Sequence, residues 1–354
     1  MKKINKMLLS MALVAGFIGV GVVPVQAADE KDLDVWGILN NLTTRSSSPS
    51  TAVLSGLASS SLDSSGVMKY ASRSNGIGIE ISPRSGEPLQ IQSPLGHLSV
   101  QLPFSKLASN SRLIASGIVE FNNNNGSSSV PVIKNDGSLQ LTSIVQTENA
   151  PTRFDYQIKL DGPTKIVKYG DGLLLFNGDK FAGAVAPAWA KDAEGRSVPT
   201  HFEVNASTIT QVVDHQSARF SYPIVADPWL GVNLFSSIYI APWTAGGLPV
   251  VNLNLSPWGW LVYTGVAQGG LPLSFGAGQA ILDTAGWDEA WGKGGAIRAA
   301  LDKPSQRQQF SCHALGAIAA GEWNLEKFRL NRLNGDWAVG VAVHHCNWTT
   351  ADRY

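Results

Sequence analysis

The chain has 354 residues, and its 27 lysines and arginines balance its 27 aspartates and glutamates, so the formal net charge is zero. A balanced charge provides no attraction to nucleic acid or to anionic lipid, and we predict no nucleic-acid partner. Charged residues make up 15% of the chain, against roughly 25% in typical globular proteins, and the 36 glycines favour a turn-rich β protein.

The first 27 residues have the layout of a secretory signal peptide. Lysines in MKKINK precede the uncharged apolar run MLLSMALVAGFIGVGVV, and small residues follow at Val25 and Ala27. This order predicts that residues 1–27 are a signal peptide, cleaved after Ala27. An uncleaved anchor is the alternative, because the apolar run is close to the lower length limit for spanning a bilayer. We expect cleavage, and hence a secreted, extracellular protein with no stable membrane anchor.

Residues 28–69 divide into a short amphipathic segment and a serine-rich stretch. Leu33, Trp36, Leu39 and Leu42 recur at a spacing close to that of a helix. The following TTRSSSPSTAVLSGLASSSLDSSG has little to bury and is typical of a linker or a mobile arm. Residues 28–66 are either a pro-segment or a tether.

Residues 70–228 consist of short alternating runs such as GIGIEIS, HLSVQLP and FDYQIKL, separated by turn sequences such as KNDGS and YGDG. Strands of this kind, with no convincing helix between them, predict an antiparallel β-sandwich. The apolar phase of each strand would build the core, and the polar phase would face water. No cysteine occurs in this module, so we expect no thiol chemistry in it.

Residues 228–282 contain neither a charged residue nor a histidine. Prolines and glycines interrupt this stretch too often for a membrane-spanning helix. VVNLNLSPWGWLVY alternates polar and apolar residues, as a strand with one solvated face does. The stretch therefore predicts buried strands of a second sheet, and the alternative is a membrane-inserting β-hairpin.

The C-terminal residues are predicted to combine helices with a hairpin. DTAGWDEAWGKGG predicts a short helix in which Trp287 and Trp291 lie one turn apart. DKPSQRQQFSCHALGAIAAG predicts a second helix, and EKFRLNRLNGDWAVGVAVHHC predicts a β-hairpin that turns at Asn334-Gly335. Residues 229–354 are thus expected to form a Trp-rich α+β domain. The predicted fold class is mostly β, with an antiparallel β-sandwich followed by this smaller helix-plus-hairpin domain.

The two cysteines, Cys312 and Cys346, each have histidine neighbours. A cysteine nucleophile with a histidine base is one interpretation. However, neighbouring residues on a helix diverge by about 100°, so His313 is poorly placed to activate Cys312. In an exported chain the better prediction is a disulfide between the two cysteines, which would staple the second helix to the last strand.

The predicted disulfide also determines which histidines can approach each other. Along WAVGVAVHHC, His344 shares a strand face with Cys346, so His344 and His313 would lie near the bridge, with Glu322 as a nearby carboxylate. These three residues are the candidate catalytic residues of an acid–base site. No H-E-x-x-H or C-x-x-C spacing supports zinc, and we predict no metal and no cofactor. The plainest interpretation gives both histidines structural roles only.

Tryptophans concentrate after residue 228, where nine of the eleven lie. The core is the default place for them, but exposed ones would stack on the rings of a sugar. Trp287, Trp291 and Trp323, with Asn324 supplying hydrogen bonds, are the candidate ligand-binding residues. The predicted partner is an extracellular ligand, with a cell-envelope glycan as the candidate.

The motifs AGWDEAW, QRQQFSCHALGA, GEWNLE and HHCNW together resemble an uncharacterised C-terminal domain, a domain of unknown function, of secreted and mostly actinobacterial proteins. This resemblance covers roughly residues 230–350. APAWAKDAEGRSVPTHFEV, ITQVVDH and YPIVADPW look like a β-rich module common in exported actinobacterial proteins. The resemblances imply a secreted location and a two-part architecture, and they imply no reaction.

We therefore expect a secreted binding or effector module that acts on a cell-surface or envelope target. One alternative is a secreted hydrolase that uses His313, His344 and Glu322. The other is a membrane-active toxin that uses residues 228–282.

Overall fold

The structure of the protein is a computed structural model that describes residues 34–48, 50–72, 76–217, 219–264, 276–316, 321–332 and 346–348. The chain divides into two units, Met1–Leu33 and Asp34–Tyr354, and every described residue belongs to the second. The predicted signal peptide therefore lies outside the described residues. Within the part that is described, no helix has both the length and the apolar character needed to cross a bilayer.

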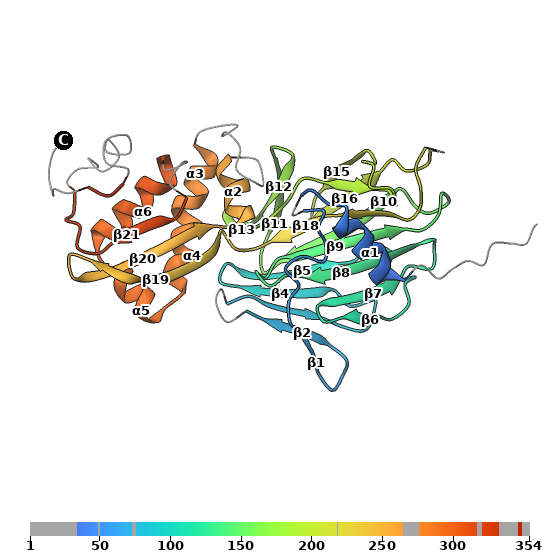
Figure 1. Ribbon diagram of the computed structural model, residues 1–354, viewed down its shortest axis with the longest axis horizontal. Coiled ribbons are helices and arrows are strands. Elements are labelled where there is room, and N and C mark those ends of the chain that lie inside the picture. Colours follow the sequence, from blue (N-terminus) through green and yellow to red (C-terminus); the bar gives the residue numbers. More distant parts are fainter. Residues whose placement is uncertain are drawn as a thin grey trace, which may run out of the picture. The chain divides into compact units, whose positions relative to one another are not determined.

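Two antiparallel sheets form the larger part of the described chain (Figure 1). One has eight strands in the order β1 (Ser61–Leu62), β2 (Met68–Ala71), β3 (Gly78–Ile81), β4 (Leu89–Ser93), β5 (Gly96–Gln101), β10 (Arg153–Leu160), β16 (Thr208–Val213) and β15 (Thr200–Asn205). The other has ten strands and runs β11 (Thr164–Tyr169), β12 (Gly172–Asn177), β13 (Lys180–Val185), β18 (Trp229–Gly231), β9 (Leu139–Val145), β8 (Ser127–Ile133), β7 (Ile118–Asn122) and β6 (Arg112–Ala115). Its remaining strands are β14 (Trp189–Lys191) and β17 (Ile224–Asp227), which pair with each other, and β17 also pairs with β9. The predicted β-sandwich is confirmed.

Strand β10 shows how the sequence builds the core of the sandwich. In RFDYQIKL every second residue is buried, beginning with Phe154, and the residues between are exposed. The buried set belongs to one cluster that draws side chains from both sheets. Burying each large apolar side chain contributes roughly 1.5–3 kcal/mol, so this alternation both specifies the strand and stabilises the two-layer packing.

Helix α1 (Val35–Thr44) covers the outer face of the ten-stranded sheet. Asp34 caps the helix by accepting a hydrogen bond from the backbone N–H of Trp36. Leu39 packs in a cluster with Val130 of β8 and Ile144 of β9, so these two strands are buried on both faces. The predicted amphipathic segment is confirmed as a helix, but Trp36 is 40% exposed instead of belonging to the buried stripe.

The serine-rich stretch after α1 is not a free linker, and that prediction is wrong. Val53 and Ala58 within it are buried. The buried Lys134 donates hydrogen bonds from Nζ to the backbone carbonyls of Val53 and Ser55, and the second is 2.9 Å long. Burial lowers the pKa of Lys134 to about 8. A few apolar side chains and one buried cation are thus enough to fix a segment whose composition is that of a linker.

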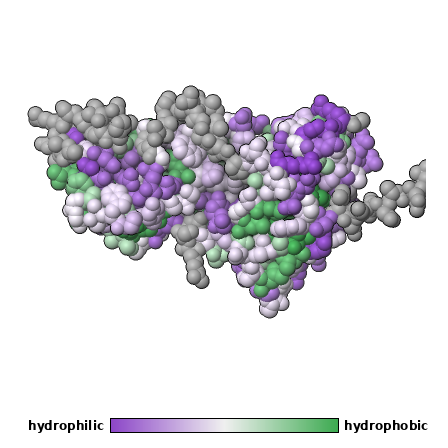
Figure 2. All heavy atoms as spheres, viewed as in Figure 1, coloured by the Kyte–Doolittle hydropathy of each residue, from purple (hydrophilic) through white to green (hydrophobic). Residues whose placement is uncertain are grey.

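Apolar side chains also remain exposed at one edge of the sandwich. Leu62 of β1 and Leu113 of β6 are 48% and 51% exposed. Figure 2 shows apolar residues gathered over this region of the surface. Exposed leucines of this kind are ordinary on a protein surface and need no functional explanation.

A third antiparallel sheet consists of β19 (Phe235–Ala245), β20 (Leu248–Leu255) and β21 (Trp323–Glu326). One of its faces, which includes Val251 and Leu253, shares a buried cluster with the C-terminal helices. These are α2 (Pro257–Thr264), α3 (Ala277–Ile281), the π-helix η1 (Leu282–Gly286), α4 (Trp287–Gly292), α5 (Gly295–Leu301) and α6 (Pro304–Gly316). The described part of residues 228–282 thus supplies strands, as predicted, but β19 is buried on one face only. The α+β character of this part is confirmed.

The C-terminal part shares its core with the sandwich. The ring of Trp229 on β18 lies 5.2 Å, between centroids, from that of Trp258 on α2. A Cβ atom added at Gly231 would come within 1.9 Å of the Trp258 ring, so only glycine lets the indole lie on β18. Because β18 belongs to the ten-stranded sheet, the sandwich extends past the predicted boundary at residue 228.

The segment PWGWLVY was predicted to continue a strand, but it lies in α2. Ser256 Oγ accepts a hydrogen bond of 3.0 Å from the backbone N–H of Gly259, as an N-cap does. Pro257 occupies the first helical position, where its missing N–H costs nothing. The helix is buried on most sides, so its sequence carries no polar face to reveal the helical period.

The two predicted C-terminal helices are confirmed, with η1 and α4 in the first and α6 in the second. The predicted hairpin from residue 326 onward differs. The strand is β21, which ends at Glu326, and residues 327–332 form turns and irregular chain. Residues 333–345, with the predicted turn at Asn334-Gly335, lie outside the described residues.

Candidate functional site

Strand β21 separates two chemically different surfaces. Trp323 and Leu325 face the buried cluster. Because side chains alternate along a strand, Asn324 faces the other way. Glu322, which immediately precedes β21, bonds to Asn252 and Asn254 of β20 on that side. The register pairs Asn252 of β20 with Asn324, so this second face is polar across neighbouring strands.

Glu322 is the centre of a hydrogen-bond network on this polar face. Its Oε2 accepts from the Tyr239 hydroxyl (2.7 Å) and from Asn254 Nδ2 (2.7 Å), and its Oε1 accepts from Asn252 Nδ2 (2.7 Å). Asn252 Nδ2 also donates to the Tyr239 oxygen (3.3 Å), and Asn254 Nδ2 donates to Ser237 Oγ (3.0 Å). We call these five residues the Glu322 network. Its short bonds fix the carboxylate and leave acceptor capacity on Oε1.

Two aromatic side chains of β19 are exposed in this part of the molecule. Tyr239 is 38% exposed, and its hydroxyl is fixed by Glu322 and Asn252. Trp243 is 43% exposed and lies where the β19–β20 register shifts. The same strand therefore presents two rings to solvent, one of them held in place by the Glu322 network.

His313 is buried beneath β21. It lies on α6, is 2% exposed, and stacks on the Trp323 ring with centroids 5.4 Å apart and an interplanar angle of 12°. Burial lowers the pKa of His313 to about 4, so the ring is neutral at neutral pH. Glu322 lies on the opposite face of β21, and the predicted acid–base pair of His313 and Glu322 is therefore not brought together. His344 lies outside the described residues.

The disulfide between Cys312 and Cys346 is present. It joins α6 to residues 346–348, which are also held by a hydrogen bond of 2.7 Å from Trp348 Nε1 to the Leu330 carbonyl. Arg329 donates to the Trp348 carbonyl at 2.6 Å. With both sulfurs bonded, neither cysteine is a nucleophile. Within the described chain, no three His, Cys, Asp or Glu residues gather as metal ligands would.

Trp287 and Trp291 stack on each other, with centroids 5.9 Å apart. Arg307 lies 5.2 Å from the Trp287 ring, and Arg298 lies 5.4 Å from the Trp291 ring. Arg307 is in turn fixed to Asp283 by a hydrogen bond of 2.5 Å. The tryptophans were predicted to stack on a sugar, but their faces are already occupied by each other and by guanidinium groups.

The third tryptophan of the predicted ligand site has no exposed surface. Trp323 is 1% exposed, covered by His313 and by the rings of Phe235 and Phe310. A strand residue facing the core cannot stack on a ligand, so its place in the predicted site is wrong. Asn324 does lie on the polar face, next to Asn252 in the register.

The Glu322 network contains one predicted residue and four that the sequence analysis missed. Asn252 and Asn254 belong to the alternation in VVNLNL, which indicated a solvated strand face without a partner for it. That partner, Glu322, is 68 residues further along the chain than Asn254. The comparisons add nothing to the site, because no family model, no curated protein and no solved structure matches the chain.

Proposed function

We propose that this protein is exported and that its C-terminal part binds a glycan of the cell envelope through the polar face of β19, β20 and β21. Two observations support export. The sequence begins with a segment of signal-peptide character, and the Cys312–Cys346 disulfide is consistent with an oxidising, extracellular location.

The observation that carries glycan binding is the exposed Tyr239 ring fixed by Glu322. A sugar offers an apolar C–H face and a rim of hydroxyls. An aromatic ring matches the first, and carboxylate and amide groups match the second. Tyr239 provides the ring, while Glu322 retains acceptor capacity beside it. Fixing the ring in advance reduces the entropy lost on binding.

Trp243 is a second exposed ring of β19, within the irregularity between Ile240 and Thr244. It lies four residues after Tyr239 on β19, and its indole is exposed. Strand geometry places side chains four residues apart at a distance of at most about 14 Å. Two rings at such a separation suit successive sugars of one linear glycan.

The test is binding of the purified protein to insoluble cell-wall peptidoglycan, measured by co-sedimentation over a range of concentrations. We expect Tyr239→Ala and Trp243→Ala each to weaken binding about five- to tenfold, as expected for the loss of one stacking contact of about 1–1.4 kcal/mol. The matched control is Trp36→Ala, because Trp36 has a similar exposure of 40% but lies on α1.

Glu322→Gln adds a second arm to this experiment. Glutamine places an amide N–H₂ where the network requires an acceptor, so the variant should release Tyr239 and weaken binding as much as Tyr239→Ala does. The proposal is refuted if the wild type does not co-sediment, or if Trp36→Ala weakens binding as much as Trp243→Ala.

A further inference from the structure

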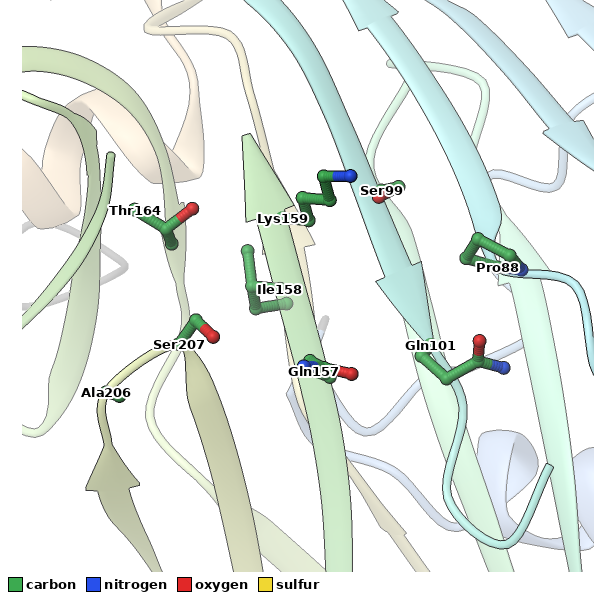
Figure 3. Close-up of a pocket in the computed structure, with 9 residues that line it drawn as sticks. All are labelled: Pro88, Ser99, Gln101, Gln157, Ile158, Lys159, Thr164, Ala206 and Ser207. Carbon is green, nitrogen blue, oxygen red and sulfur yellow. The ribbon is translucent and has the colours of Figure 1, made fainter. Parts of the chain in front are cut away.

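A second polar surface lies on the sandwich, away from the Glu322 network. It is a groove of about 570 Å³ on the outer face of the eight-stranded sheet. Figure 3 shows its lining, which comes mainly from β5, β10 and the turn between β15 and β16, with Pro88 before β4 and Thr164 of β11. We call it the β10 groove. Its volume falls within the range of about 300–1,000 Å³ that is usual for ligand sites.

The side chains along β10 change from paired to unpaired where this groove begins. Arg153, the first outward residue of the strand, forms an ion pair with Glu203. The next, Asp155, accepts a hydrogen bond of 2.6 Å from Thr210. The last two, Gln157 and Lys159, are exposed and line the groove, and neither side chain bonds to any described protein group.

Among the residues that the structure describes, no acidic side chain forms an ion pair with Lys159. Asp161, which follows β10, instead accepts a hydrogen bond of 3.1 Å from the backbone N–H of His97. Its other oxygen lies 3.6 Å from the His97 ring. The ammonium group of Lys159 is therefore free to meet an anion from outside the protein.

The register turns these residues into a continuous polar strip. Gln157 is paired with Gln101 of β5, and Lys159 is paired with Ser99. In Figure 3 the Lys159 side chain extends toward Ser99. The far wall is the turn that contains Ala206, whose φ of 51° is in the left-handed region that non-glycine residues rarely adopt. Asn205 pairs with Thr208 across this two-residue hairpin turn, and turns of this type require a positive φ at the position of Ala206.

We propose that the β10 groove binds a short acidic oligosaccharide. The Gln157 amide offers donors and an acceptor, as sugar hydroxyls require, and Gln101, whose Nε2 donates to the Ser85 carbonyl at 3.5 Å, retains its acceptor oxygen and a second N–H. Lys159 would receive the carboxylate of a uronic-acid unit. This site is independent of the glycan surface at the Glu322 network, and both together would make the protein bivalent.

A neighbouring groove on the same sheet face shows why the carboxylate of the ligand is expected at Lys159 and not further along the sheet. That groove of about 500 Å³ is lined by Gln90 and Gln92 and includes Lys69. Lys69 already has two acidic partners, Asp63 at 3.2 Å and Glu80 at 3.4 Å. Amides thus extend along the sheet face, whereas the unpaired positive charge is at the β10 groove.

The test uses isothermal titration of the purified protein with a tetramer of galacturonic acid. The matched ligand is the methyl ester of the same tetramer, which keeps the hydroxyls and loses the charge. We expect saturable binding of the acid and about tenfold weaker binding of the ester, the size of one lost hydrogen bond to a charged group. Lys159→Gln should weaken binding of the acid about tenfold and leave binding of the ester unchanged.

Two controls separate this site from others. Lys180→Gln changes an exposed lysine on β13 and should have no effect. Tyr239→Ala should also have no effect, because it changes only the C-terminal surface. The proposal is overturned by absence of saturable binding, by equal losses in Lys159→Gln and Lys180→Gln, or by citrate binding as tightly as the tetramer. It is also overturned if Tyr239→Ala abolishes binding and Lys159→Gln does not.

Discussion

Two buried titratable groups in the C-terminal core have pKa values shifted in opposite directions. Glu289 on α4 is 2% exposed and accepts hydrogen bonds from the backbone N–H groups of Leu234 (2.6 Å) and Phe235 (3.3 Å). Burial raises its pKa from 4.5 to about 7, although these bonds and the charge of Lys293 act against the shift. Burial lowers the pKa of His313 from 6.5 to about 4. The two groups should therefore give the free energy of unfolding opposite pH dependences.

The sign for each group follows from proton counting. Below pH 4.5 the Glu289 carboxyl is protonated in both states, and its contribution is fully present. Between pH 4.5 and about 7 only the unfolded state loses the proton, so stability falls as pH rises. For His313, both states are neutral above pH 6.5. Between pH 6.5 and about 4 only the unfolded state gains a proton, so stability falls as pH falls.

Both groups act in the window from pH 4.5 to 6.5, where their opposite slopes largely cancel in the wild type, so that each contribution is seen only when the other group is left alone. Each group changes the free energy of unfolding by about 1.4 kcal/mol per pH unit, or on the order of 3 kcal/mol across the window. We predict that Glu289→Gln removes the fall in stability that this carboxyl causes as pH rises. From pH 4.5 to 6.5 the free energy of unfolding of the variant should therefore rise by about 3 kcal/mol relative to that of the wild type. For His313→Phe, which keeps a ring against Trp323, the free energy of unfolding relative to the wild type should fall by a similar amount over the same rise in pH.

The assay is urea unfolding followed by tryptophan fluorescence at pH 4.5, 5.5 and 6.5. At each pH, subtracting the free energy of unfolding of the wild type from that of the variant removes the contributions of the titratable groups that both proteins share. The double variant Glu289→Gln/His313→Phe should recover the pH dependence of the wild type, because the two changes oppose each other. The reasoning is refuted if each single variant changes the free energy of unfolding by the same amount at all three pH values.

Four further changes test the packing. Gly231→Ala places a Cβ 1.9 Å from the indole above it and should destabilise the protein by about 3 kcal/mol or more. The control is Gly37→Ala on helix α1, where an added Cβ would have no atom within 4 Å, and it should stabilise the protein by up to about 1 kcal/mol. Thermal melts compare both variants with the wild type, and equal effects of the two would contradict the close packing at Gly231. Replacing both Cys312 and Cys346 by alanine removes a crosslink across a separation of 34 residues. The expected loss is roughly 3–4 kcal/mol in urea unfolding, and an unchanged midpoint would contradict it. Lys134→Met leaves two buried carbonyls without their donor, so limited proteolysis should cut the serine-rich stretch at least tenfold faster, and an unchanged rate would show that the lysine does not hold it.

The strands of the sandwich could be predicted because each carries its own signal. In β10 the alternation that begins at Arg153 is visible within eight residues and needs no distant partner. The failures occur where distant residues decide the outcome. Val53 is fixed by Lys134, 81 residues away in sequence. Helix α2 is apolar all round because it is enclosed by other elements, and the local evidence for it was Ser256 followed by Pro257.

The candidate site could be predicted only in part for the same reason. Composition identified tryptophans as possible ligand contacts, but exposure is a property of the fold. Trp287 and Trp291 are covered by arginines that the sequence places 20 and 7 residues further on. Tyr239 and Glu322, 83 residues apart, meet only because β20 lies between their strands. Spacing along one segment carries no information about such a pair.

Cys312 and His313, which are adjacent on α6, both have structural roles. Neighbouring positions on a helix point in directions about 100° apart, and the two side chains accordingly make different contacts. Cys312 bonds to Cys346, which fixes residues 346–348 beside α6, and His313 stacks beneath Trp323. Holding Trp323 in the core fixes the phase of β21. Because the strand alternates, the same phase directs Glu322 toward Tyr239. The pair that resembles a catalytic centre in the sequence therefore supports the polar face from behind and is not part of it.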